Sequence, residues 1–100
     1  MLIIAGTIDM NPEHVDAFIA AAIDMMQATL EETGCQAYSF TVDQLTPGRI
    51  CLYEKWDSQA DLEAHFVVPH MAAFQAATAD LDVTGRDLLK YDIASEGPVR

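Results

Sequence analysis

The segment Tyr53-Glu54-Lys55-Trp56 holds the first carboxylate whose surroundings could give it a chemical role. If the segment is a strand, Glu54 shares a face with Leu52 and Trp56, because side chains alternate between the two faces. A carboxylate buried among apolar groups has a raised pKa, because burial disfavours its charge. Glu54 is therefore a candidate general base near neutral pH. The alternative is a carboxylate exposed at an edge, or one hydrogen-bonded to the backbone or to a lysine.

His65 is the second candidate for proton transfer. It follows Leu62 by three residues and precedes Phe66, so a helix through this segment places it on or beside the buried face. An imidazole in that place could donate, accept or titrate near neutral pH. The alternative is a structural histidine hydrogen-bonded to Asp61, one turn earlier. The sequence does not say whether Glu54 and His65 meet in one pocket.

The sequence offers no complete set of metal ligands. His70 follows His65 by five residues, across a helix break at Pro69, and positions five apart do not share one helix face. Cys35 and Cys51 have no metal-ligand spacing, and we expect two buried free thiols. The chain also lacks a glycine-rich phosphate loop and a nucleophile elbow. We therefore expect no metal site and no flavin, nicotinamide or ATP.

Strand and helix patterns alternate along the chain and position these candidates. We expect strands over residues 2–10, 37–42, 50–56 and 87–93. The first helix begins at Asn11-Pro12-Glu13, where Asn can cap and Pro suits the first turn, and it ends near Gly34. Its predicted apolar face consists of Val15, Phe18, Ile19, Ala22, Met26 and Leu30.

A second helical region follows the third strand. Ser58-Gln59-Ala60-Asp61 is a capping box with Asp in the usual Glu position, Pro69 interrupts the helix, and helix resumes around His70. The resulting order is β-α-β-β-α-β. It predicts a single α+β domain over residues 1–100, with a ferredoxin-like fold and a four-stranded antiparallel sheet.

The strands are apolar on both faces, as Leu2-Ile3-Ile4 and Leu88-Leu89 show. Helices in this arrangement cover only one face of the sheet. The other face would be an apolar patch large enough to need a partner. We therefore predict a homodimer formed sheet to sheet.

The charge of the chain excludes some classes of partner. The chain has sixteen acidic and five basic residues, which gives a formal net charge of -11. The basic residues form no cluster in the sequence. Binding to nucleic acid or to an anionic membrane is therefore not expected. No apolar run approaches the roughly 20 residues of a membrane span, and no secretory signal opens the chain, so we expect a cytoplasmic protein.

The run from Tyr53 to Phe66, continued by Pro69-His70-Met71 and Phe74, resembles the antibiotic biosynthesis monooxygenase family. The shared pattern is a strand ending in Tyr-x-x-Trp or Glu-x-Trp, a capped helix, a His about nine residues after the Trp, and then a His and an aromatic residue. The resemblance extends from Ile3 to about Tyr91. It implies a dimeric α+β barrel, in which two ferredoxin-like units join through their sheets, with a pocket between helices and sheet in each.

The resemblance also implies a chemistry. Several members of the family are monooxygenases that use no metal or organic cofactor and act on quinols or polyketide hydroxyaromatics. For this chain it implies a small-molecule substrate, O2 and no cofactor. Glu54 or His65 would be the base, and the other, or Tyr53, its hydrogen-bonding partner. The implied substrate-binding residues are Trp56, Phe66, His70 and Phe74.

Other branches of the same superfamily supply alternatives. The haem-degrading branch has a Trp where this chain has His65 and a haem-ligating His where it has Gln75, so we do not expect haem. The autoinducer-2-degrading isomerase shares Tyr53-Glu54 and His65, but it has a His late in the first helix where this chain has Met25-Met26. A third alternative is a non-catalytic binding or stress-associated domain.

Overall fold

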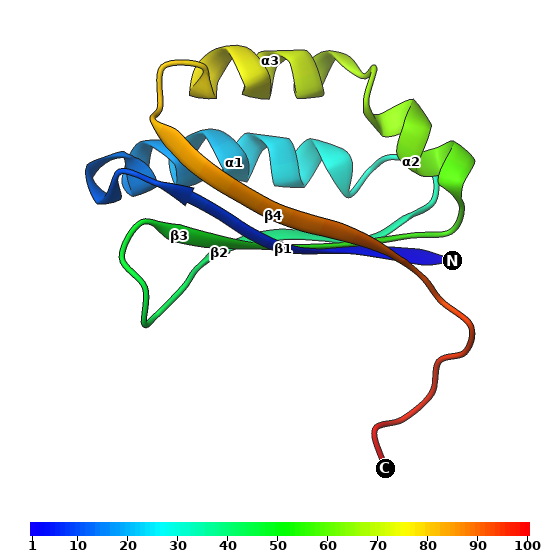
Figure 1. Cartoon of the computed structure of the whole chain (residues 1–100). Helices are drawn as coiled ribbons and strands as arrows, with labels where there is room; N and C mark the ends of the chain where they lie inside the picture. Colours follow the sequence, from blue (N-terminus) through cyan, green and yellow to red (C-terminus); the bar gives the residue numbers. More distant parts are fainter.

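Four antiparallel strands form one sheet in the order β2-β3-β1-β4 (Figure 1). The computed structural model describes all residues, 1–100. The strands are β1 (Leu2–Met10), β2 (Cys35–Val42), β3 (Arg49–Trp56) and β4 (Val83–Asp92). The predicted β-α-β-β-α-β order and the ferredoxin-like α+β fold are confirmed.

The helices α1 (Val15–Thr29), α2 (Gln59–His65) and α3 (Pro69–Thr78) all lie on one side of the sheet (Figure 1). A 3-10 turn, η1 (Pro12–His14), precedes α1, and the Asn11 side chain accepts a hydrogen bond from the Glu13 amide as the sequence predicted. The break between α2 and α3 also falls where predicted, with Val68 extended before Pro69. None of these helices has the length and apolar character needed to cross a membrane.

The structure corrects the predicted extent and core face of the first helix. α1 ends at Thr29, several residues before Gly34, and Leu30 beyond it is exposed. Its buried residues are Phe18, Ala22, Met25 and Thr29. Steps of four, three and four residues keep these positions on one face, because the helix repeats every 3.6 residues. Met25 therefore joins the buried core, Met26 packs against it partly buried, and only Leu30 of the predicted face is exposed.

The last strand is longer than predicted at its start. β4 begins at Val83 and not at Asp87, because its first residues pair with the far end of β1, where Met10 lies opposite Val83. This added length brings Arg86 into the sheet, in register with Ile8. This pairing matters for function because the side chains of Ile8 and Arg86 then both project toward the helices.

The helix-covered face of β3 carries the predicted row of side chains. Ile50, Leu52, Glu54 and Trp56 are all buried, as strand alternation requires. Phe18 packs edge-to-face on both Phe40 and Phe74, with ring centroids 5.4 Å apart in each pair. These contacts join α1, α3 and the sheet into one core.

The opposite face of the sheet has no helical cover (Figure 1). Ala5 lies there between Tyr53 and Leu89, its partners on the two neighbouring strands, and Ile3 lies opposite Tyr91. Tyr53, Leu89 and Tyr91 are exposed in the single chain. This face therefore carries an exposed apolar patch, as the sequence predicted, together with the Arg49–Asp9 and Lys55–Glu96 ion pairs. The dimer that would cover the patch stays a prediction.

Candidate active site

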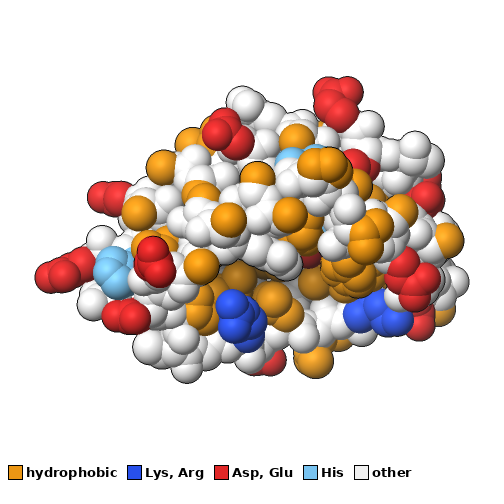
Figure 2. Space-filling view, turned by 90° about the horizontal axis from the view of Figure 1, so that it is seen from above, with side chains coloured by type: hydrophobic (Ala, Val, Ile, Leu, Met, Phe, Trp, Pro, Cys, Tyr) orange, Lys and Arg blue, Asp and Glu red, His pale blue; other side chains and the backbone are white.

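A cavity of about 320 Å³ lies between the helices and the helix-covered face of the sheet. Seen from the helical side, hydrophobic side chains surround a hollow, and Lys and Arg side chains lie along one of its edges (Figure 2). Its walls come from all four strands, from α1 and α3, and from the α2–α3 connection. The lining residues are Ile8, Phe18, Tyr38, Leu52, Glu54, Phe66, Met71, Phe74, Gln75, Thr78, Val83, Arg86 and Leu88.

Glu54 is the one carboxylate in this wall, and it is only 6% exposed. Burial raises its pKa from 4.5 to about 6, and the charge of Glu32 adds to the rise. The opposing influence is the Trp56 indole, whose Nε1–H donates to Glu54 Oε1 at 2.9 Å. The alternative of a Glu54 exposed at a sheet edge is therefore wrong. The residue is a buried proton acceptor that faces an apolar cavity.

Of the predicted substrate-binding residues, Phe66 and Phe74 line this cavity and Trp56 and His70 do not. Trp56 is fully buried, and its indole donates a hydrogen bond to the Glu54 carboxylate. Phe66, the residue directly after α2, is exposed rather than part of the core.

Tyr53 was predicted as a hydrogen-bonding partner at the site, but the structure separates it from the cavity. It is the neighbour of Glu54 in β3, and neighbouring side chains of a strand point to opposite faces. Tyr53 therefore lies on the uncovered side of the sheet, where it is 41% exposed.

Tyr38 and Arg86, two polar side chains of the cavity, were not among the predicted site residues. Tyr38 lies opposite Glu54 in the β2–β3 pair, and burial together with the Glu54 charge holds the pKa of its phenol far above the ordinary value. It therefore stays protonated and can donate a hydrogen bond. Arg86 lines the cavity from β4. Strand alternation would have placed it there had the strand been predicted to begin at Val83.

His65 is 1% exposed at the end of α2, and it lies against the rings of Tyr38 and Trp56, with centroids 5.3 and 5.0 Å away. It does not line the cavity. The local partner considered from sequence, Asp61, accepts instead from the Ser58 hydroxyl that caps α2. Glu54 and His65 therefore contact the same Trp56, but only Glu54 faces the space a substrate could fill.

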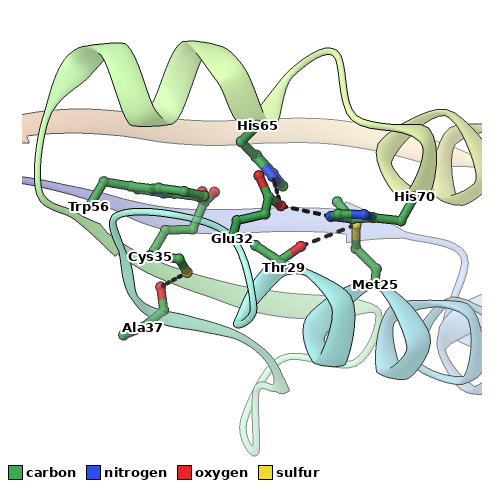
Figure 3. Close-up of polar contacts among 9 residues, drawn as sticks. Met25, Thr29, Glu32, Cys35, Ala37, Trp56, His65 and His70 are labelled. Carbon is green, nitrogen blue, oxygen red and sulfur yellow. Dashed lines mark hydrogen bonds and ion pairs between the residues drawn. The ribbon is translucent and has the colours of Figure 1, made fainter.

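Glu32 joins the two histidines, and it too was not among the predicted site residues. Its Oε2 lies 2.8 Å from His65 Nδ1 and 2.7 Å from His70 Nε2, and Figure 3 shows the carboxylate between the two rings. The other ring nitrogen of His65, Nε2, is buried without a hydrogen-bonding partner. His70 also lines a second cavity, of about 230 Å³, between α1 and α3, and Phe74 lies on the walls of both cavities.

The turn that carries Glu32 is fixed on both sides. The Glu32 amide donates to the Thr29 carbonyl, and the Glu32 carbonyl accepts from the Cys35 amide. Gly34 has a φ of 80°, and a Cβ there would lie 2.1 Å from Asp61 Oδ2. Only glycine fits this position, which lets the turn pack against the start of α2.

The two cysteines do not join the site. Both are free thiols, as predicted, although each is only partly buried. Burial and the nearby Glu32 and Glu54 charges raise the pKa of Cys35 to about 11, which makes it a poor nucleophile at neutral pH.

Comparison with known proteins points to one family. Residues 1–77 match the family model described as antibiotic biosynthesis monooxygenase. "Probable quinol monooxygenase YgiN" of Escherichia coli (strain K12) is 32% identical over 87 residues, which are 77% of this chain and 84% of that protein. An uncharacterized protein of Synechocystis is 29% identical over 93 residues, and this chain spans 63% of its length.

Solved structures share the fold over nearly the whole chain. A protein of Deinococcus radiodurans that carries the same family description superposes with a TM-score of 0.88 at 26% identity, over 100% of this chain and 99% of that one. Rv0793 from Mycobacterium tuberculosis superposes with a TM-score of 0.81 at 23% identity, over 97% of each chain.

Proposed function

Because this chain belongs to the antibiotic biosynthesis monooxygenase family, we propose that it uses O2 to oxidise a small electron-rich aromatic, a quinol or a related hydroxyaromatic. The observation that carries the proposal is the buried carboxylate of Glu54 in the wall of an apolar cavity, with a pKa raised to about 6. Such a carboxylate is a stronger base than an exposed one and is still mostly ionised at neutral pH. No metal or organic cofactor takes part in the proposed reaction.

The proposed reaction begins when Glu54 accepts the proton of a substrate hydroxyl group. The resulting anion gives one electron to O2, and the two radicals combine at a ring carbon to form a peroxide. The O–O bond then breaks, one oxygen stays on the ring as a carbonyl, and the other leaves as water with the proton held by Glu54 and the hydrogen of that carbon. One phenol and one O2 thus give one quinone and one water.

Tyr38 and Arg86 are proposed to stabilise the anion that forms. The Tyr38 phenol stays neutral and can donate to the substrate oxygen, and the Arg86 guanidinium supplies a positive charge at the cavity wall. Donors placed before the charge develops lower the barrier most, because they need no reorganisation during the reaction. In this arrangement His65 packs beside Tyr38 and Trp56 and supports the geometry around Glu54.

The cavity also limits the size of the substrate. Pockets for small ligands range from about 300 to 1,000 Å³. At about 320 Å³, this cavity is near the lower end, which favours an aromatic of one or two rings. Its aromatic and aliphatic walls suit such a ring and leave room for O2.

The test is O2 consumption by purified protein treated with a chelator, with a panel of one- and two-ring quinols and hydroxyaromatics. We expect protein-dependent uptake that forms one quinone for each O2 consumed. No uptake across the panel would contradict the proposal. Turnover of the phosphorylated autoinducer-2 signal without O2 consumption would instead support the isomerase alternative.

The uncovered face of the sheet is proposed to pair with a second copy of the chain. A Leu89→Glu change would place a charge in the middle of that face, and burying an unpaired charge is costly. We expect light scattering after size exclusion to give twice the 11.0 kDa chain mass for the wild type and a single chain mass for the variant.

Leu45→Glu is the matched control for this variant, because Leu45 is 92% exposed in the β2–β3 connection. It adds the same charge away from the sheet face and should leave the dimer intact. A wild-type protein that is monomeric at micromolar concentration would contradict the dimer.

A further inference from the structure

We propose that Glu32, His65 and His70 form a binding site for a divalent transition-metal ion of the Zn²⁺ class, beside the substrate cavity and separate from it. One donor atom from each of the three residues lies within 4.8 Å of the other two. Two imidazoles and one carboxylate are a donor set that Zn²⁺ and its neighbours in the first transition row accept. This inference goes beyond the proposed oxidation, in which none of the three residues touches the substrate.

The three donors come from three different parts of the chain. Glu32 lies in the turn after α1, His65 ends α2, and His70 lies in the first turn of α3. Figure 3 shows the Glu32 carboxylate reaching between the two imidazole rings. Because the fold already holds the donors together, metal binding would cause only a small loss of side-chain entropy.

The two distances from the carboxylate are close to those of a filled site, and the two ring nitrogens lie within 4.8 Å of each other. The Glu32 oxygen lies 2.8 and 2.7 Å from the two ring nitrogens. Ligand atoms at about 2.0–2.1 Å from a zinc ion lie roughly 3.0–3.4 Å from one another. The carboxylate would therefore need to retreat by only about half an ångström. In the metal-free chain, the same oxygen accepts a hydrogen bond from one nitrogen of each ring. On metal binding these nitrogens would present lone pairs to the ion, and the proton that each carried would move to the other nitrogen of its ring or be released.

An ion has a route to these donors. The His65 side chain is 1% exposed, but those of Glu32 and His70 are 12% and 26% exposed. His70 also lines the cavity between α1 and α3, whose wall contains a further carboxylate, Asp24. Three protein ligands leave at least one coordination position for water. The formal charge of -11 adds a general attraction for cations.

The test is a titration of chelator-treated protein with Co²⁺, whose visible absorption reports its ligands and geometry. We expect absorption that saturates at one Co²⁺ per chain and that added Zn²⁺ abolishes, since Zn²⁺ takes the same ligands. His70→Ala and Glu32→Gln should each weaken binding by about tenfold or more. Glu32→Gln keeps an acceptor for both imidazoles, so its fold is expected to survive, and circular dichroism checks this for each variant.

His14→Ala is the matched control, because His14 is the one remaining histidine of the chain and accepts a hydrogen bond from the Asp82 amide, away from the three donors. Absence of saturable Co²⁺ binding would overturn the metal site, as would equal affinity in wild type, His70→Ala and Glu32→Gln. Loss in His14→Ala as large as in His70→Ala would overturn it as well. These results are independent of O2 consumption, so failure of the metal site and failure of the proposed oxidation are distinguishable.

Discussion

Replacing Glu54 by Gln is expected to lower the rate of O2 consumption by about 10²- to 10⁴-fold, the usual contribution of a positioned general base. The Gln amide has nearly the size of the carboxylate, and its oxygen can still accept the hydrogen bond from Trp56. The cavity therefore keeps its shape and loses only the proton acceptor. In the wild type, kcat/KM should rise as pH increases through about 6, because Glu54 must be ionised to act.

Glu63→Gln is the matched control, because Glu63 is an exposed residue of α2 outside the cavity. It makes the same chemical change without touching the site and should leave the rate unchanged. Full activity in Glu54→Gln would remove Glu54 as the base. His65→Gln would then become the next variant to measure.

The same Glu54→Gln change is expected to stabilise the fold above pH 6. The pKa of Glu54 is 4.5 ordinarily and about 6 in the folded chain, so between these values the folded chain holds more protons than the unfolded chain. The free energy of unfolding of the wild type therefore falls as pH rises through this window and levels off above it. The difference between these two pKa values corresponds to a change of about 2 kcal/mol in the free energy of unfolding.

Urea unfolding of wild type and Glu54→Gln between pH 4 and 8 measures this effect. One fixed protein concentration is used, because dimerisation makes the apparent stability depend on concentration. From pH 4 to pH 8, the free energy of unfolding of the variant should rise by about 2 kcal/mol relative to that of the wild type. Parallel pH profiles would show that burial does not perturb Glu54. The ionised Glu54 carboxylate lowers the stability of the fold, whereas a neutral side chain at this position would not. A residue that is kept despite this loss of stability is what a catalytic role predicts.

Local sequence signals were sufficient for the element order and for Glu54. Alternation with a period of two placed Glu54 on the buried face of its strand beside Trp56, and the Ser58 cap and Pro69 marked where helices begin. These signals act within a few residues, so they can be read without knowing the fold. The same alternation should have excluded Tyr53 from the side of the sheet that faces the helices.

The rest of the site depends on long-range contacts. Glu32 is 33 residues from His65 and 38 from His70 in the chain, so nothing near Glu32 indicates its partners. Asp61, the local partner considered for His65, accepts a hydrogen bond from the capping Ser58 hydroxyl instead. Arg86 was missed for a related reason, because β4 begins at Val83 only through pairing with β1.

Phe74 connects the two cavities of the molecule. Its ring lies on the wall of the cavity that contains Glu54 and on the wall of the cavity that contains His70. A ligand that displaces the ring on one side changes the space on the other, and any resulting linkage must be reciprocal. An aromatic ligand that changes the affinity for Co²⁺ would then see its own affinity changed by the same factor when Co²⁺ binds.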